Sequence, residues 1–110
     1  MNSKLLGLVS ISRKAGKLAI GFDPAAEALA AGKAALVLTA PGHSPKTRSE
    51  LEYRVNKGVK AIEIIQLPLT MDDLSAVLGK RAGILAVLDQ GLADALRRQI
   101  KREENSEYVG

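Results

Sequence analysis

The chain has 110 residues, of which 46% are hydrophobic and 3% aromatic, and it carries a formal net charge of +4. A chain of this length suits a single domain with a self-supporting core, which here must be aliphatic and rich in alanine. The sequence contains no cysteine, which excludes disulfides, thiolate metal sites and a cysteine nucleophile.

The positive charge is concentrated in the first half of the chain. Residues 1–60 carry ten Lys or Arg against four acids, a net charge of +6, whereas residues 61–110 carry six against eight, a net charge of −2. A basic half favours a polyanionic partner, although many small soluble proteins are also modestly basic. The sequence lacks a long apolar run and a signal-peptide pattern, so we expect a cytoplasmic protein without a membrane partner.

The first 40 residues predict two helix–strand pairs separated by glycines. The first helix begins at Asn2-Ser3 and ends at Gly16, and a strand follows over residues 17–20. Asp23 is expected to cap the second helix, with Pro24 at its first position, where a missing amide costs nothing. The apolar run over residues 35–40 is typical of a strand that is covered on both faces.

The remaining sequence continues the alternation of helices and strands. Ser44 and Pro45 predict the start of a third helix that closes at Gly58, and Thr70 with Asp73 resembles a capping box for a fourth helix that ends at Gly79. We expect strands over 61–67 and 84–88, a fifth helix from about Gly91 to residue 102, and an acidic frayed tail over 103–110.

Strict alternation of helices and strands predicts an α/β/α sandwich, in which helices cover both faces of one sheet. We therefore expect one domain over residues 1–102 followed by the tail. Sequence alone does not determine the order of the strands.

Residues for catalysis or metal binding are scarce. His43 is the single histidine and stands in a Pro/Gly loop, and the segment around Lys46 lacks the glycine that a phosphate-binding loop requires directly before its lysine. Asp89 ends the last strand without a base or nucleophile beside it, so we expect it to cap the fifth helix. These observations favour a binding module over an enzyme, with no catalytic residue, metal or cofactor.

Five segments in order carry a resemblance to a known family. They are Ser12-Arg13-Lys14-Ala15-Gly16-Lys17-Leu18, Gly21, Gly32-Lys33-Ala34-Ala35-Leu36-Val37-Leu38, Leu78-Gly79-Lys80, and Leu85-Ala86-Val87-Leu88-Asp89. In this combination the chain resembles the kink-turn RNA-binding ribosomal protein family (L-seven-Ae, L-thirty-e and relatives), in particular its small bacterial YlxQ-type branch. The resemblance spans roughly residues 5–100 and implies a four-stranded mixed sheet with about five helices, and RNA binding without catalysis.

The resemblance also implies where RNA binds. The family uses the start of the second helix and the loop before the last strand, which correspond to Gly21, Phe22, Asp23, Pro24, Glu27 and the loop 80–83. Neighbouring lysines are expected to add a basic rim along the same edge. The expected RNA-binding residues are Lys14, Lys17, Gly21, Phe22, Asp23, Lys33, Lys80 and Arg81.

Three residues depart from the family pattern. Asp23, Pro24 and Glu27 stand where kink-turn binders typically have an Asn or Lys, a Glu or Gln, and a Lys. Because two of these residues place negative charge near an approaching phosphate, we expect weakened or altered specificity for structured RNA. The first hypothesis is a monomeric, ribosome-associated RNA-binding protein. The alternative is a protein-interaction or regulatory module on the same fold that does not bind RNA, for which Phe22 beside Ala25 and Ala26 offers an apolar patch.

Overall fold

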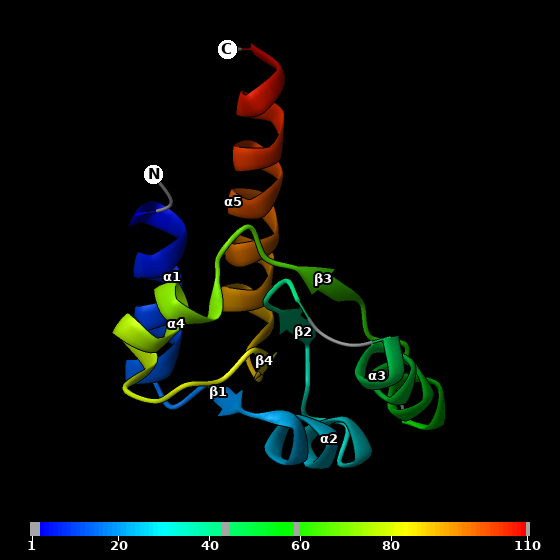
Figure 1. Cartoon of the computed structure of the whole chain (residues 1–110). Coiled ribbons are helices and arrows are strands. Elements are labelled where there is room, and N and C mark those ends of the chain that lie inside the picture. Colours follow the sequence, from blue (N-terminus) through cyan, green and yellow to red (C-terminus); the bar gives the residue numbers. More distant parts are fainter. Residues whose placement is uncertain (1–2, 43–44, 59, 110) are drawn as a thin grey trace.

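The structure, a computed structural model, describes residues 3–42, 45–58 and 60–109. Helices and strands alternate along the chain, and α1, α4 and α5 lie on one side of the sheet while α2 and α3 lie on the other (Figure 1). The expected α/β/α architecture is therefore confirmed. The elements are α1 (Ser3–Lys14), β1 (Leu18–Ile20), α2 (Phe22–Ala30), β2 (Leu36–Thr39), α3 (Pro45–Lys57), β3 (Ile64–Gln66), α4 (Met71–Leu78), β4 (Ile84–Val87) and α5 (Gln90–Val109).

The four strands form one mixed sheet in the order β1-β4-β2-β3. The last strand, β4, lies between β1 and β2 and is antiparallel to both, with Leu18 opposite Val87 and Thr39 opposite Ile84. The pairing of β2 with β3 is parallel. The two central strands are buried on both faces, as the continuous apolar runs in their sequences predict.

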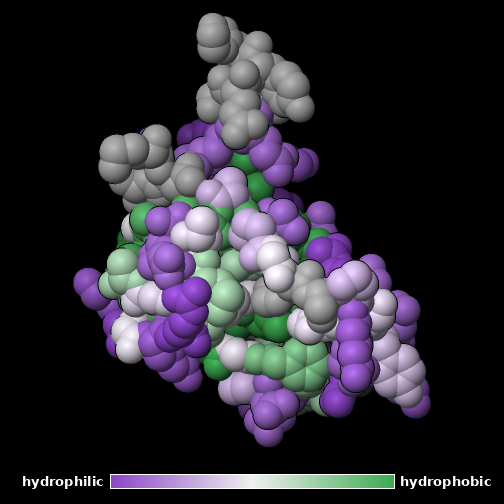
Figure 2. Space-filling model, viewed as in Figure 1, coloured by the Kyte–Doolittle hydropathy of each residue, from purple (hydrophilic) through white to green (hydrophobic). Residues whose placement is uncertain are grey.

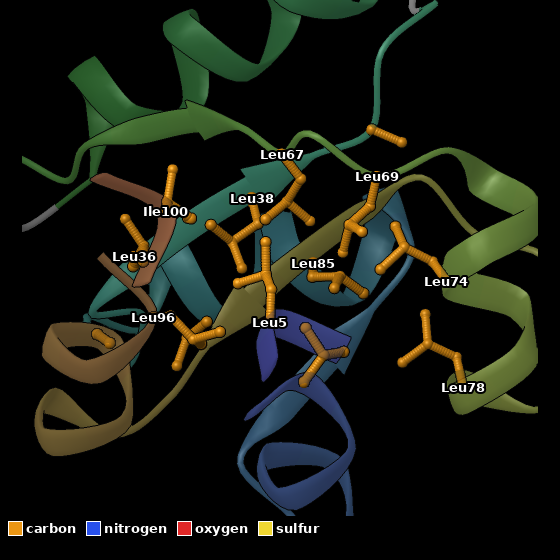
Figure 3. Close-up of a cluster of buried hydrophobic side chains, with 14 residues drawn as sticks. Leu5, Leu36, Leu38, Leu67, Leu69, Leu74, Leu78, Leu85, Leu96 and Ile100 are labelled. Carbon is orange, nitrogen blue, oxygen red and sulfur yellow. The ribbon is translucent and has the colours of Figure 1, made fainter. Parts of the chain in front are cut away.

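One face of the sheet carries the larger, leucine-rich core. Leu36 and Leu38 of β2 and Leu85 of β4 point to this face, because alternate residues of a strand face opposite sides of the sheet. Side chains from α1, α4 and α5 complete the cluster, as Figure 3 shows. Leu5, Leu38, Leu74 and Leu96 are all fully buried.

The opposite face is packed with smaller side chains. Ala25 and Ala28 of α2 lie against Val37 of β2 and Ala86 of β4, and α3 contributes Leu51. Alanines lack bulk beyond the β-carbon, so α2 packs closely on the sheet. The alanine-rich sequence of α2 thus serves both helix propensity and close packing.

Two elements differ from their expected bounds by three or more residues at one end. β3 covers only Ile64–Gln66 rather than residues 61–67, because its parallel pairing with β2 reaches only these three residues. α5 continues to Val109, so residues 103–109, expected as a frayed tail, are helical. A side-chain hydrogen bond of 2.9 Å from Gln99 to Glu103, one turn apart, supports this extension. His43 and Ser44, the expected loop and cap before α3, lie outside the described residues.

The ends of α4 confirm the sequence expectation. The Thr70 hydroxyl accepts from the Asp73 amide at 3.0 Å, and the Asp73 carboxylate accepts from the Thr70 amide at 3.0 Å. The helix ends at Gly79, whose φ of 75° is left-handed and suits glycine. These two ends determine where the loop to β4 begins.

We predict that Thr70→Ala destabilises the protein by about 1 kcal/mol, because it removes the hydroxyl that accepts from the first turn of α4. Urea unfolding monitored by circular dichroism measures the change. Ser49→Ala, at an exposed position in α3, is the matched control and should stay within about 0.5 kcal/mol of the parent. Equal stability of Thr70→Ala and the parent would contradict the capping role.

Candidate functional site

Two loops distant in sequence meet at one edge of the sheet. The Gly21 amide, directly after β1, donates to the carbonyl of Ile84 at 2.8 Å, and the Gly83 carbonyl accepts from the Ala40 amide at 2.8 Å. The meeting follows from topology, because β1 ends where its antiparallel neighbour β4 begins. We call residues 21–23 and 80–83 the loop edge.

The start of α2 has no side-chain cap. The helix begins at Phe22, and the Gly21 carbonyl accepts the first helical hydrogen bond from Ala25 at 3.1 Å. The expectation that Asp23 caps this helix is wrong, since Gly21 is the N-cap and no side chain donates or accepts there. Because Pro24 has no amide, the unpaired first-turn amides belong to Phe22 and Asp23. These amides and the helix dipole favour an anion at the loop edge.

Phe22 lines a hollow beside the loop edge. Its side chain is half-buried, and the guanidinium carbon of Arg54 lies 6.0 Å from the ring centroid. The hollow has a volume of about 330 Å³ and lies between the start of α2 and α3. It is lined by Phe22, Lys46, Thr47, Glu50 and Ile84.

The loop before β4 exposes its two basic residues, Lys80 and Arg81, while Ala82 and Gly83 are buried. Arg81 pairs with Asp72, but both side chains are largely exposed, so the pair is weak and the guanidinium stays accessible to another anion. Figure 2 shows hydrophilic side chains over α4 and this loop, and others over α3, with a more hydrophobic area between them. Arg13 of α1 also reaches this region, since its Nη2 atom lies 3.3 Å from the position that a β-carbon on Gly79 would take. The sequence did not indicate Arg13 as a site residue, because only the packing of α1 on α4 brings its side chain to this region.

Lys14, Lys17 and Lys33 do not lie on the loop edge. Lys14 is the last residue of α1, and Lys17 and Lys33 stand in the connections that enter β1 and β2, whereas Gly21 follows β1. The Lys17 carbonyl accepts from Leu88, at the far end of β4 from Ile84. The expectation of one basic rim is therefore wrong, and the candidate residues divide between two edges of the sheet. We call Lys14, Lys17 and Lys33 the lysine edge.

Among the described residues, no group of three or more His, Cys, Asp or Glu side chains is arranged to hold a metal ion. Asp89 instead caps α5, because its carboxylate accepts from the Leu92 amide at 2.9 Å. Within the described part of the chain, no helix has the length and hydropathy needed to cross a membrane.

The model of the family described as Ribosomal protein L7Ae/L30e/S12e/Gadd45 matches residues 3–97. The chain belongs to this family. It is 35% identical to the large ribosomal subunit protein eL30B of Schizosaccharomyces pombe over 98 residues, which cover 87% of this chain and 79% of that protein. It is 34% identical to the large ribosomal subunit protein eL30 of Neurospora crassa over 88 residues, covering 78% and 79%.

Solved structures share the fold of this family member. A protein with unknown function from Bacillus halodurans C superimposes with a TM-score of 0.79 at 21% identity, covering 89% of this chain and 97% of that one. A 15.5kD RNA binding protein from Giardia lamblia superimposes with a TM-score of 0.70 at 17% identity, covering 94% and 88%. At these identities the two structures support the fold alone.

We predict that Gly21→Ala destabilises the protein by about 1–3 kcal/mol, because φ of 104° and ψ of 165° form a region that only glycine adopts without strain. Gly7→Ala is the control: Gly7 lies inside α1 with open space around it, so alanine there should stabilise by about 0.5–1 kcal/mol. Thermal and urea unfolding of both variants measure the difference. The prediction fails if the two substitutions change stability in the same direction.

Proposed function

We propose that this chain is a non-catalytic, ribosome-associated RNA-binding protein that contacts structured RNA through the loop edge. The observation that carries the proposal is the hydrogen bond from Gly21 to Ile84, which joins the open start of α2 to the basic loop 80–83. Membership of a family of ribosomal proteins, with two eL30 proteins among the relatives, supports RNA as the partner.

The loop edge offers complementary groups for an RNA backbone. The Phe22 and Asp23 amides point outward from the start of α2, where a phosphate oxygen accepts hydrogen bonds and the helix dipole favours its charge. Lys80, Arg81 and Arg13 supply positive charge from two further elements. Phosphate contacts of this kind position a protein on RNA without reading its sequence.

The hollow beside Phe22 adds a place for an unstacked base. Phe22 and the buried side chain of Ile84 provide apolar walls, and Lys46 and Glu50 provide polar groups at the same hollow. Proteins commonly recognise RNA by stacking a splayed base on an aromatic ring and binding its edge with polar groups. The hollow therefore favours RNA with a kink, bulge or loop over a regular duplex.

Kink-turn binding of reduced or altered specificity is the finer part of the proposal. Asp23 and Glu27 are both exposed on α2, one turn apart, and Asp23 stands beside the amides that would hold a phosphate. Their charges oppose the approach of the backbone, whereas the helix dipole and the loop 80–83 favour it. On the residue pattern of the YlxQ-type branch we further propose a bacterial, cytoplasmic monomer.

A titration across salt concentrations tests the function. Fluorescently labelled kink-turn RNA, the same RNA with the kink replaced by paired bases, and purified ribosomes are the three ligands. We expect binding to the kinked RNA and ribosomes that weakens linearly as the logarithm of salt concentration rises. Weak, salt-insensitive association with all three ligands would sink the proposal and favour the protein-interaction module instead.

We predict that Lys80→Ala weakens binding to kinked RNA and lowers the salt slope by about one charge, because Lys80 lies on the loop edge. Lys33→Ala removes the same charge at the lysine edge and should leave the slope for a short kinked RNA nearly unchanged. Fluorescence anisotropy at four or more salt concentrations measures both slopes. Equal losses in the two variants would show that the RNA is not held at the loop edge.

We predict that Asp23→Asn strengthens binding to kinked RNA by about fivefold at low salt, because it removes one negative charge near a phosphate, an effect on the order of 1 kcal/mol. The shape of the side chain is retained, so the helix start is preserved. Glu104→Gln, an exposed change of equal charge on α5, is the control and should change affinity little. A decrease in affinity for Asp23→Asn would instead mean that RNA uses the carboxylate as an acceptor.

A further inference from the structure

A second hollow lies on the seam between α2 and α3, farther along both helices than the hollow beside Phe22. It has a volume of about 240 Å³ and lies next to the C-terminal halves of both helices. We call this hollow the α2–α3 groove. It is lined by Ala26, Ala30, Tyr53, Arg54, Lys57 and Gly58.

The groove follows from the spacing of residues on α2. Phe22, Ala26 and Ala30 recur every four residues and therefore form one stripe along the helix. Phe22 lines the hollow at the loop edge, and the two alanines, which are short, line the groove behind it. At the far end a side chain on Gly58 would come within 3.1 Å of the Leu29 carbonyl, so glycine there allows α3 to approach α2.

One wall of the groove is an exposed aromatic ring. The chain contains only one Phe, two Tyr and no Trp, yet Tyr53 is 52% exposed rather than buried in the core. A large apolar ring left in water forgoes the favourable free energy of burial. The Nζ atom of Lys57 lies 5.3 Å from the centroid of the Tyr53 ring, which holds a cation at the same surface.

The charged residues that line the groove favour a negatively charged ligand. Arg54 and Lys57 line the groove and are cationic, and no acid is among its lining residues; Glu50 is paired with the Nε atom of Arg54 at 3.1 Å. A basic segment would be repelled, whereas a polyanion is attracted. Exposed aromatic rings beside cations are the arrangement by which proteins bind single-stranded nucleic acid, with bases stacked and phosphates neutralised.

We propose that the α2–α3 groove binds a single-stranded RNA segment that continues from the loop edge, with a base stacked on Tyr53 and a phosphate beside Lys57. The proposal rests on RNA binding at the loop edge and extends it by a second contact. α2 and α3 both run from the end of a strand on the loop-edge side toward the other end of the sheet, so the groove leads away from Phe22. A strand leaving the Phe22 hollow along this seam enters the groove lined by Arg54, Tyr53 and Lys57.

The fluorescence of Tyr53 tests stacking directly. Since the chain has no tryptophan and only two tyrosines, Tyr108→Phe leaves Tyr53 as the single emitting residue. Titration with an eight-residue uridine oligomer should quench this emission, because a stacked base quenches the ring beneath it. The oligomer needs no kinked RNA, so this test stays valid whatever happens at the loop edge. Free tyrosine amide in the same oligomer solutions reports the loss caused by absorption of the exciting light alone, and a loss no greater than this for Tyr53 would overturn the groove assignment.

Affinity measurements test the continuity of the two contacts. Kinked RNA with a single-stranded extension should bind more tightly than the same RNA without it, by about fivefold to 100-fold for one stacked base. Tyr53→Ala should abolish this gain while leaving affinity for the RNA without extension unchanged, and Tyr53→Phe should retain it. Lys57→Ala should lower the salt slope for the extended RNA by about one charge.

Two controls separate specific from general effects. Ile11→Ala removes the other large exposed apolar side chain among the described residues, which lies on α1 across the sheet, and should not change the gain. Lys101→Ala removes an exposed charge on α5 and should not change the slope. If kinked RNA binds but Tyr53→Ala keeps the full gain, the groove proposal fails while the proposed function stands. If kinked RNA does not bind but the oligomer quenches Tyr53, the loop-edge proposal fails and the groove still binds single strands.

Discussion

The placement of β4 between β1 and β2 is the constraint on which the rest of the molecule depends. This strand is the last in the sequence, and its residues belong alternately to both cores, Leu85 and Val87 on one face and Ile84 and Ala86 on the other. Without it the sheet would divide into an isolated β1 and a β2–β3 pair. The same pairing places the loop 80–83 beside Gly21, so the stability of the sheet and the geometry of the site have one physical origin.

The antiparallel direction of β4 also decides how the positive charges are distributed. Each strand is only three or four residues long, so its two ends present separate surfaces. Lys80 and Arg81 precede β4 at one end of the strands. Lys17 and Lys33 precede β1 and β2 at the opposite end. A net charge of +6 in the first half of the chain therefore does not form one basic patch at the loop edge. The packing of α1 on α4 brings Arg13 close to Gly79, so Arg13 adds one positive charge near the loop edge.

Small side chains shape the surface as well as the core. Ala25 and Ala28 let α2 lie close to the sheet, while Ala26 and Ala30 on the next stripe leave a groove toward α3. One alanine-rich helix thus explains both dense packing below and a hollow beside it. The two described aromatic residues, Phe22 and Tyr53, line consecutive hollows along this seam rather than the main leucine core.

The sequence by itself determined the alternation of helices and strands, the capping box of Thr70 and Asp73, the αL end at Gly79 and the cap at Asp89, because these depend on local hydrogen bonding and residue spacing. It also indicated the family and the two loops that form the candidate site. The sequence pattern predicted Asp23 as the cap of α2, but the cap is Gly21. The position of the cap depends on where β1 ends, and Gly21 directly follows its last residue. Only the tertiary structure decided the order of the strands, the division of the lysines between two edges, the arrival of Arg13 and the groove beside Tyr53. These features arise from pairing and packing between residues far apart in the chain, which no local pattern encodes.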